Sequence, residues 1–419
     1  MSTSIFSARL ARWLPFALMA VSALLLLHHG AEVIAVLRHG AGRAALTLDF
    51  RTYLCGAGDL TAPYDICHDA EYVSGFVYPP PALIYFHLLS RLTIDTAFTI
   101  HLLVCLAGLG AASWLLLRMV AVPRRAGVVA LLAALAIAPI GTSLAAGQVN
   151  ILLMTSAVAG IWFAGRNRPG LAGLSIALGF WLKIYPGLVP VLFLTRERWR
   201  SAAATIAAAG LIALLGLIWA SPSLYAQYVL QVLPHAQGYT MPGVAHSLAG
   251  MAAHVQAGGG RPVQHFVPIG EGVQLASRLL LALGLLAAFL HGVVTRGKRP
   301  LDSLNLLLCV TLVAAPNAWG YHYAMIFPAI FAALARELAA PRRRGLPLVL
   351  GCWLALVIPA WSDLPQPLAD VALLDVAFHG RYALVALALA GAILAEAARE
   401  APSSPARRGD MAGLSFTAP

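Results

Sequence analysis

The chain has few charged residues for its length of 419 residues. Asp, Glu, Lys and Arg together make up 11% of it and hydrophobic residues 60%, whereas soluble domains carry about 25% charged residues. This scarcity excludes an ordinary soluble domain and is typical of a multi-pass membrane protein. The apolar residues leave room for ten or more spans of about 20 residues each.

Acidic residues are especially scarce, with 17 Asp and Glu against 28 Lys and Arg. The net charge of +11 raises the question of a nucleic-acid partner. The basic residues, however, form short clusters between apolar runs, as the cytoplasmic loops of membrane proteins require. We therefore expect the lipid bilayer as a partner, and no nucleic acid.

Signatures of nucleotide binding are also missing. The chain has no Gly-rich phosphate loop of the Walker type and no GxGxxG between a strand and a helix. An energy-driven pump and a nucleotide-sugar enzyme are therefore unsupported, and no cofactor is expected. No internal repeat is visible either, although transporters commonly carry one.

Cysteine is rare, with five residues in the chain. Cys105, Cys309 and Cys352 lie inside apolar runs, where we interpret them as small packing residues. Cys55 and Cys67 share the first long polar segment, where a disulfide can form if that segment is extracytoplasmic. The sequence leaves open whether these two are bonded or free.

The apolar runs predict one integral membrane domain over residues 1–400, an all-α polytopic fold of about 10–12 transmembrane or partly inserted helices. The apolar piece at 79–92 is only about 21 Å long as a helix, too short for a hydrocarbon core of about 30 Å. The run at 169–194 is interrupted at Tyr185-Pro186-Gly187. The tail at 401–419 is predicted to be disordered and cytoplasmic. The other spans are expected near 13–37, 95–117, 126–142, 148–165, 201–220, 273–295, 301–316, 319–336, 345–362 and 381–397.

The positive-inside rule orients these spans. If 79–92 and 169–194 each return to the side on which they started, every basic cluster falls in the cytoplasm, together with both termini. If both are single crossings, Arg124 and Arg125 fall outside. The first arrangement is therefore preferred, and it places four polar segments on the extracytoplasmic face. The basic clusters are 118–125, 166–168, 196–200, 296–299, 336–344 and the tail.

The polar segment from Leu48 to Leu83 holds five of the scarce carboxylates: Asp49, Asp59, Asp65, Asp69 and Glu71. A membrane protein that gathers its acids in its first water-facing loop is expected to use one for chemistry. Asp49 is the candidate, because apolar neighbours hold it near the lipid boundary, where a partly desolvated carboxylate is a stronger base toward a hydroxyl. Alternatively, Asp49 pairs with Arg51 or caps a short helix.

Lys183 is the one strong charge inside an apolar run that this arrangement does not place in a cytoplasmic loop. Intramembrane charges are costly and are functional candidates by default. Next to a helix break, this ammonium is well placed to hold a phosphate at the membrane surface. The alternative is a lysine that extends to the interface without any further role.

Two further segments carry polar groups to the same face. Gln148 and Asn150 follow Gly147 at the start of a span, where their amides can bind sugar hydroxyls or cap the helix. His322, flanked by Trp319 and other aromatic residues, suits a sugar subsite, because aromatic rings pack on the apolar faces of pyranoses. An interfacial aromatic belt would have the same composition.

Four histidines between 221 and 272 raise the question of a metal. They are His235, His246, His254 and His265. No carboxylate or cysteine ligand lies at a useful spacing among them, so no metal site is predicted.

Five short motifs match a known family in order. They are Asp49-Phe50 with Tyr53, Tyr78-Pro79-Pro80, Gly147-Gln148-x-Asn150, Lys183-x-x-Pro186 with Arg198-Trp199-Arg200, and Pro316-Asn317-x-Trp319 with His322. Together they span about two thirds of the chain and resemble glycosyltransferase family 87. These are polytopic enzymes of the GT-C superfamily, which resemble polyprenol-phosphate-mannose-dependent mannosyltransferases.

The resemblance implies a GT-C-like bundle, a polyprenyl-phosphate sugar donor and an extracytoplasmic active site. It also implies inverting transfer without a metal to a glycolipid or glycan acceptor, with an Asp in the first loop as base, which maps onto Asp49. On this basis the expected phosphate-binding residues are Lys183, His322 and Arg51, and the expected sugar- or acceptor-binding residues are Tyr53, Tyr78, Gln148, Asn150, His246 and Trp319.

The chain departs from the family pattern in two places. Ala245-His246-Ser247-Leu248 stands where the family often has Asn-Gln-Ser-Leu, and Ala315-Pro316 replaces the usual Ser-Pro. A hexose, mannose, is the expected sugar, and the first departure leaves that specificity open. The rival function is a transporter or flippase of a lipid-linked sugar. The missing repeat and the gathering of polar motifs at one face favour the enzyme.

Overall fold

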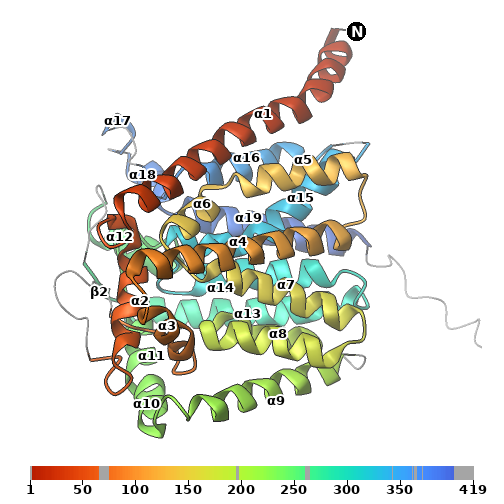
Figure 1. The fold of residues 1–419 in the computed structure, drawn as a ribbon. Helices are drawn as coiled ribbons and strands as arrows, with labels where there is room; N and C mark the ends of the chain where they lie inside the picture. The colour runs from red at the N-terminus through yellow and green to blue at the C-terminus, as the bar shows by residue number, and fades with distance from the viewer. Residues whose placement is uncertain are drawn as a thin grey trace, which may run out of the picture.

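The computed structural model describes residues 2–65, 75–194, 198–259, 265–341, 343–360, 362, 366–369 and 371–400 (Figure 1). Across these ranges the regular secondary structure is helical apart from an isolated bridge and one small antiparallel sheet, in which β1 (Tyr239–Thr240) pairs with β2 (Val267–Pro268). The predicted all-α polytopic fold is confirmed.

Five helices of the described chain are long and apolar enough to cross a membrane. They are α1 (Ser2–His39), α4 (Ile94–Met119), α9 (Trp199–Gly216), α13 (Glu271–Val294) and α19 (Arg381–Glu400). Four shorter apolar helices accompany them: α7 (Asn150–Gly165), α8 (Pro169–Leu182), α14 (Pro300–Ala314) and α16 (Leu346–Val357). All of them appear among the expected spans.

The span predicted at 126–142 is broken. It consists of α5 (Arg124–Leu135) and α6 (Ala138–Ala145), which are bent by 53° relative to each other. Pro139 stands in the first turn of α6, where its missing N–H does no harm. In the middle of one continuous helix the same proline would remove a hydrogen bond and clash with the preceding turn.

Two other predicted spans contain 3₁₀ segments. The segment predicted at 319–336 begins as a 3₁₀ helix, η4 (Gly320–Ile326), and continues as α15 (Phe327–Ala339). The run at 169–194 is interrupted as expected, because α8 ends at Leu182 and η2 (Tyr185–Phe193) follows. Between them Lys183 has an extended backbone.

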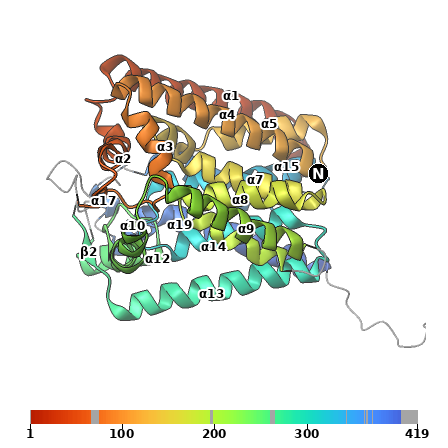
Figure 2. The same cartoon turned by 60° about the horizontal axis from the view of Figure 1, so that its bottom comes forward.

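The short elements gather at one end of the bundle (Figure 1). The polar segment expected as a loop contains α2 (Leu48–Gly58), and the short apolar piece contains α3 (Ala82–Ser90). Also at this end lie α10 (Pro222–Gln227), α11 (Leu233–Gly238), α12 (Leu248–Gln256) and α18 (Ala372–His379). Figure 2 shows the same separation after rotation, with α13 running along the edge of the bundle. The connections α4–α5, α7–α8 and α13–α14 lie at the opposite end.

Some predicted features fall outside the described residues. These are Cys67, Asp69, Glu71, Arg196 and the tail at 401–419. Cys55 is disulfide-bonded, so it is not a free thiol. Its pairing with Cys67 stays a prediction. Cys105, Cys309 and Cys352 are free and buried, in agreement with a packing role.

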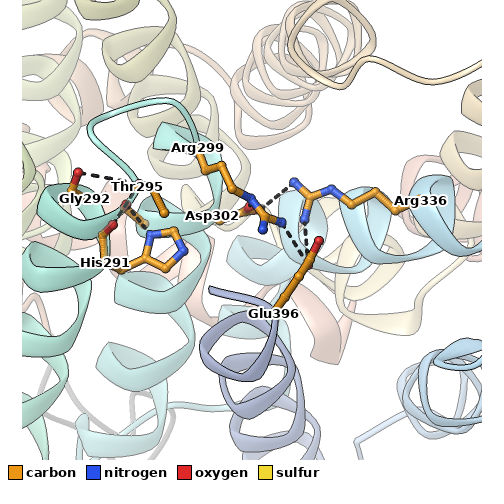
Figure 3. A network of polar contacts seen from close by, with 8 residues as sticks. His291, Gly292, Thr295, Arg299, Asp302, Arg336 and Glu396 are labelled. Carbon is orange, nitrogen blue, oxygen red and sulfur yellow. Dashed lines mark hydrogen bonds and ion pairs between the residues drawn. The ribbon is translucent and has the colours of Figure 1, made fainter. Parts of the chain in front are cut away.

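An ionic network around the buried Asp302 joins three helices (Figure 3). Asp302, 1% exposed, binds Arg299 Nε at 2.6 Å and Arg336 Nη2 at 2.7 Å. Glu396 on α19 lies 2.8 Å from Arg299 Nη2 and 3.7 Å from Arg336 Nη1. The network therefore ties α14 to the ends of α15 and α19.

Replacing Asp302 with asparagine is expected to destabilise the protein by about 3–5 kcal/mol, because two arginines lose their buried counter-charge. The measurement is the thermal unfolding temperature in detergent. Glu396→Gln is the matched control, since Glu396 is 45% exposed and its loss is expected to cost about 1 kcal/mol or less. Equal shifts in the two variants would contradict this ranking.

Candidate active site

One cavity of about 760 Å³ opens among the short elements and the ends of the long helices. Its walls are largely apolar and aromatic. Six of the predicted site residues line it: Asp49, Tyr53, Tyr78, Lys183, Trp319 and His322. Segments that lie up to 273 positions apart in the sequence thus meet at one place.

Asp49 stands in the first turn of α2. Buried residues recur at helical spacing along α2, at Phe50, Tyr53 and Ala57. Asp49 lies next to this buried face and lines the cavity together with Tyr53. Its Oδ2 accepts hydrogen bonds from Tyr321 Oη at 2.5 Å and from Gln148 Nε2. Burial raises the pKa of Asp49 above its usual value, while Tyr321, Lys183 and Gln148 act in the opposite direction.

The turn at Gly147 aims Gln148 at Asp49. Gly147 has a φ of +65°, and a Cβ there would lie 2.9 Å from the side chain of Phe50. Only glycine fits such a left-handed and crowded position. The backbone at Gly147 therefore packs directly against Phe50. Asp49 comes just before Phe50 in the sequence, and the Gln148 amide donates to its carboxylate.

Lys183 occupies the break between α8 and η2. Its Nζ lies 2.6 Å from His322 Nε2, and 5.5 Å and 5.7 Å from the ring centres of Tyr78 and Tyr185. At these distances the rings attract the ammonium electrostatically. Aromatic faces and one imidazole therefore surround the only lysine of the cavity wall.

His322 is oriented by the backbone of its own 3₁₀ turn. The N–H of Trp319 donates to His322 Nδ1 at 2.8 Å. Nδ1 is therefore occupied, and Nε2 faces Lys183 Nζ. The imidazole and Lys183 lie side by side on the cavity wall, and the lysine supplies the positive charge that an anion requires.

The family model of glycosyltransferase family 87 matches residues 76–316, more than half of the chain. The chain belongs to glycosyltransferase family 87. It is 27% identical over 313 residues to the polyprenol-phosphate-mannose-dependent alpha-(1-2)-phosphatidylinositol mannoside mannosyltransferase of Mycobacterium tuberculosis, covering 70% of this chain and 69% of the relative. It is 26% identical over 323 residues to the corresponding phosphatidylinositol pentamannoside enzyme of Mycolicibacterium smegmatis, covering 74% of each.

The family match begins after Asp49 and ends before His322. The placement of these two residues in the cavity of this glycosyltransferase is therefore an observation separate from the match. The predicted family is confirmed, and so is the prediction of an enzyme that transfers a sugar.

Gln148 and Asn150 lie behind the cavity of the glycosyltransferase. Both are buried, and neither lines the wall. Asn150 Nδ2 donates to the carbonyl of Tyr321 at 3.3 Å, and no side chain caps α7. The structure thus places these amides against Asp49 and the Tyr321 turn, and their contact with sugar hydroxyls stays a prediction.

Arg51 and His246 also lie off the cavity wall. Arg51 Nη1 donates to the carbonyl of Gly42 at 3.4 Å. His246 is fully buried and stacks on Tyr382, with the ring centres 4.5 Å apart. The contacts of Arg51 with phosphate and of His246 with sugar stay predictions.

Tyr321 and Tyr185 were not predicted as site residues, yet both line the cavity. Tyr321 binds Asp49 directly, and the ring of Tyr185 lies near the Lys183 ammonium. The available signal was their position: Tyr321 precedes His322, and Tyr185 follows Lys183 by two residues.

Proposed function

We propose that the chain is a membrane mannosyltransferase that moves mannose from a polyprenyl-phosphate donor to a hydroxyl of a glycolipid or glycan. The observation that carries the proposal is the cavity lined both by a partly buried carboxylate, Asp49, and by the Lys183–His322 pair. The names of the two mycobacterial relatives support this donor class and sugar. The rival, a flippase, needs no base.

Asp49 acts as the general base in this proposal. Tyr321 and Gln148 both donate to Oδ2, so Oδ1 is directed to the acceptor hydroxyl. As the acceptor oxygen attacks the anomeric carbon, Asp49 takes its proton, and the bond from that carbon to the phosphate oxygen breaks. Attack opposite the leaving phosphate inverts the anomeric centre.

Lys183 and His322 receive the leaving phosphate. The Lys183 ammonium, with the His322 imidazole beside it, meets the negative charge that grows on the polyprenyl phosphate, an interaction that strengthens toward the transition state. Apolar residues of the same cavity wall, including Leu188, Val229 and Leu281, suit the hydrocarbon chain of the donor. Tyr53, Tyr78 and Trp319 offer aromatic faces to the sugar or the acceptor.

The distribution of arginines between the two ends of the bundle supports an extracytoplasmic site. The cavity lies among the short elements, and the arginine-rich connections lie at the other end. The start of α1 and the end of α19 lie at the arginine-rich end as well (Figure 1). By the positive-inside rule, that end and both termini face the cytoplasm.

The direct test uses purified protein in detergent with polyprenyl-phosphate mannose, the matching glucose donor and a panel of glycolipid acceptors. The proposal expects a new glycosidic bond, formed with the mannose donor and with inverted configuration. A protein that moves the donor across vesicle membranes but makes no such bond would establish the flippase instead.

The proposal also predicts how activity in this assay falls at low pH. Only ionised Asp49 accepts a proton, and burial raises its pKa above 3.8. Activity measured as kcat/KM is therefore expected to fall, as pH decreases, at a higher pH than for an ordinary carboxyl. Tyr321→Phe removes a hydrogen bond that lowers this pKa, so the fall in activity should move to still higher pH. A shift to lower pH would contradict the assignment.

A further inference from the structure

A second polar cluster lies outside the active-site cavity. It consists of His254 on α12 and of Asp375 and His379 on α18. None of the three lines the cavity. His254 Nε2 lies 2.8 Å from Asp375 Oδ2, and His379 Nε2 lies 3.4 Å from Asp375 Oδ1. Ligand-type atoms of all three residues lie within 4.8 Å of one another.

The composition and spacing of this cluster are those of a transition-metal site. Asp375 and His379 are four positions apart on one helix, so both side chains face the same way. His254 approaches them from a different helix. Ligands held tetrahedrally at about 2.0–2.2 Å from zinc stand roughly 3.3 Å from one another. The His254–Asp375 and His379–Asp375 separations of 2.8 Å and 3.4 Å lie on either side of this value.

Burial makes a cation favourable at this place. The side chains of His254, Asp375 and His379 are only 1%, 2% and 5% exposed. A carboxylate is costly to bury unless a cation or hydrogen-bond donors compensate it. The adjacent arginine, Arg381, directs its guanidinium to the carbonyls of Phe378 and Pro359. A divalent ion would compensate the carboxylate and use the lone pairs of all three side chains.

We propose that His254, Asp375 and His379 bind one zinc ion. Imidazole nitrogen and carboxylate oxygen are ligands that zinc accepts, and three protein ligands leave a fourth position for water. The turn after α12 closes over the site, since a Cβ at Gly259 would lie 2.8 Å from Asp375 Oδ2. Zinc suits this set better than magnesium, which prefers oxygen ligands alone.

The ion would fasten the long connecting segment to the last helices. The segment before α12 forms a bridge from Ala245 to Trp319, and Trp319 lines the active-site cavity. The site fixes α12 against α18, which precedes α19. The zinc would support the wall of the cavity from outside, since none of its three ligands lines that cavity.

The experiment measures zinc in protein purified through a tag without histidine. Wild-type protein, dialysed against zinc and then against buffer, is expected to retain about one zinc per chain. His254→Gln and His379→Gln are each expected to lose it, with affinity lowered by about 100-fold or more. Zinc, but not magnesium, should raise the unfolding temperature of the wild type, because the ion binds the folded chain.

A matched control comes from the other candidate cluster that the described residues contain, His28, His29 and Glu32. Glu32→Gln should keep the zinc; loss in this variant with retention in His254→Gln would overturn the assignment. So would a wild type that takes up no zinc. If the His254 and His379 variants do not fold, cobalt(II) absorption of the wild type decides. A tetrahedral spectrum that zinc abolishes supports the site, and its absence refutes it.

Discussion

Asparagine at position 49 is expected to lower the rate of sugar transfer roughly 10³-fold, within the range that a general base contributes. The side-chain oxygen of asparagine still accepts from Tyr321 and Gln148, the partners of Asp49 Oδ2. The variant therefore keeps the geometry and loses only the proton acceptor. The measurement is kcat and KM with polyprenyl-phosphate mannose, in which kcat falls and the donor KM stays close to that of the wild type.

Asp59→Asn is the matched control for this substitution. Asp59 follows the same helix, is exposed, and binds Thr61 through its carboxylate. Its replacement should leave transfer within about twofold, since surface changes away from a site have small effects. Normal turnover in Asp49→Asn would exclude the base assignment. A lower unfolding temperature in Asp49→Asn, with donor binding lost, would indicate a structural role.

The sequence predicts the spans well because their signal is local. A run of about 20 apolar residues is sufficient to cross a membrane whatever its neighbours are. The break in the span at 126–142 was missed because hydropathy averages over Pro139. The helix α2 was missed for the opposite reason: its polar residues suggested a loop, although Phe50, Tyr53 and Ala57 recur at helical spacing.

For the candidate site, the sequence predicts only that its residues lie on the same face of the membrane. Charge patterning placed Asp49, Lys183 and His322 on one side of the membrane, and the structure lines one cavity with them. The direction of each side chain was not predictable, because it depends on contacts between distant segments. Gln148 meets a carboxylate 99 positions away, and Tyr321 meets the same carboxylate across 272 positions.

Replacing Lys183 with methionine is expected to lower kcat/KM for sugar transfer by about 10²–10³-fold, the usual cost of losing an electrostatic contact with the transition state. Methionine keeps the length of the lysine and removes its charge. Unlike Asp49→Asn, this variant should raise the donor KM as well as lower kcat, because the ammonium meets phosphate in the ground state too. His322 keeps its hydrogen bond from Trp319 N–H, so the second proposed phosphate contact is not disturbed.

Lys298→Met controls for the general loss of a lysine, since the chain has only these two lysines. Lys298 lies at the opposite end of the bundle, between α13 and α14, so transfer in this variant should match the wild type. The pattern across variants separates the two roles: a kcat effect alone for the base, and effects on both constants for the phosphate contact. A Lys183→Met enzyme with an unchanged donor KM and kcat would remove the lysine from the mechanism and leave His322 as the remaining phosphate ligand.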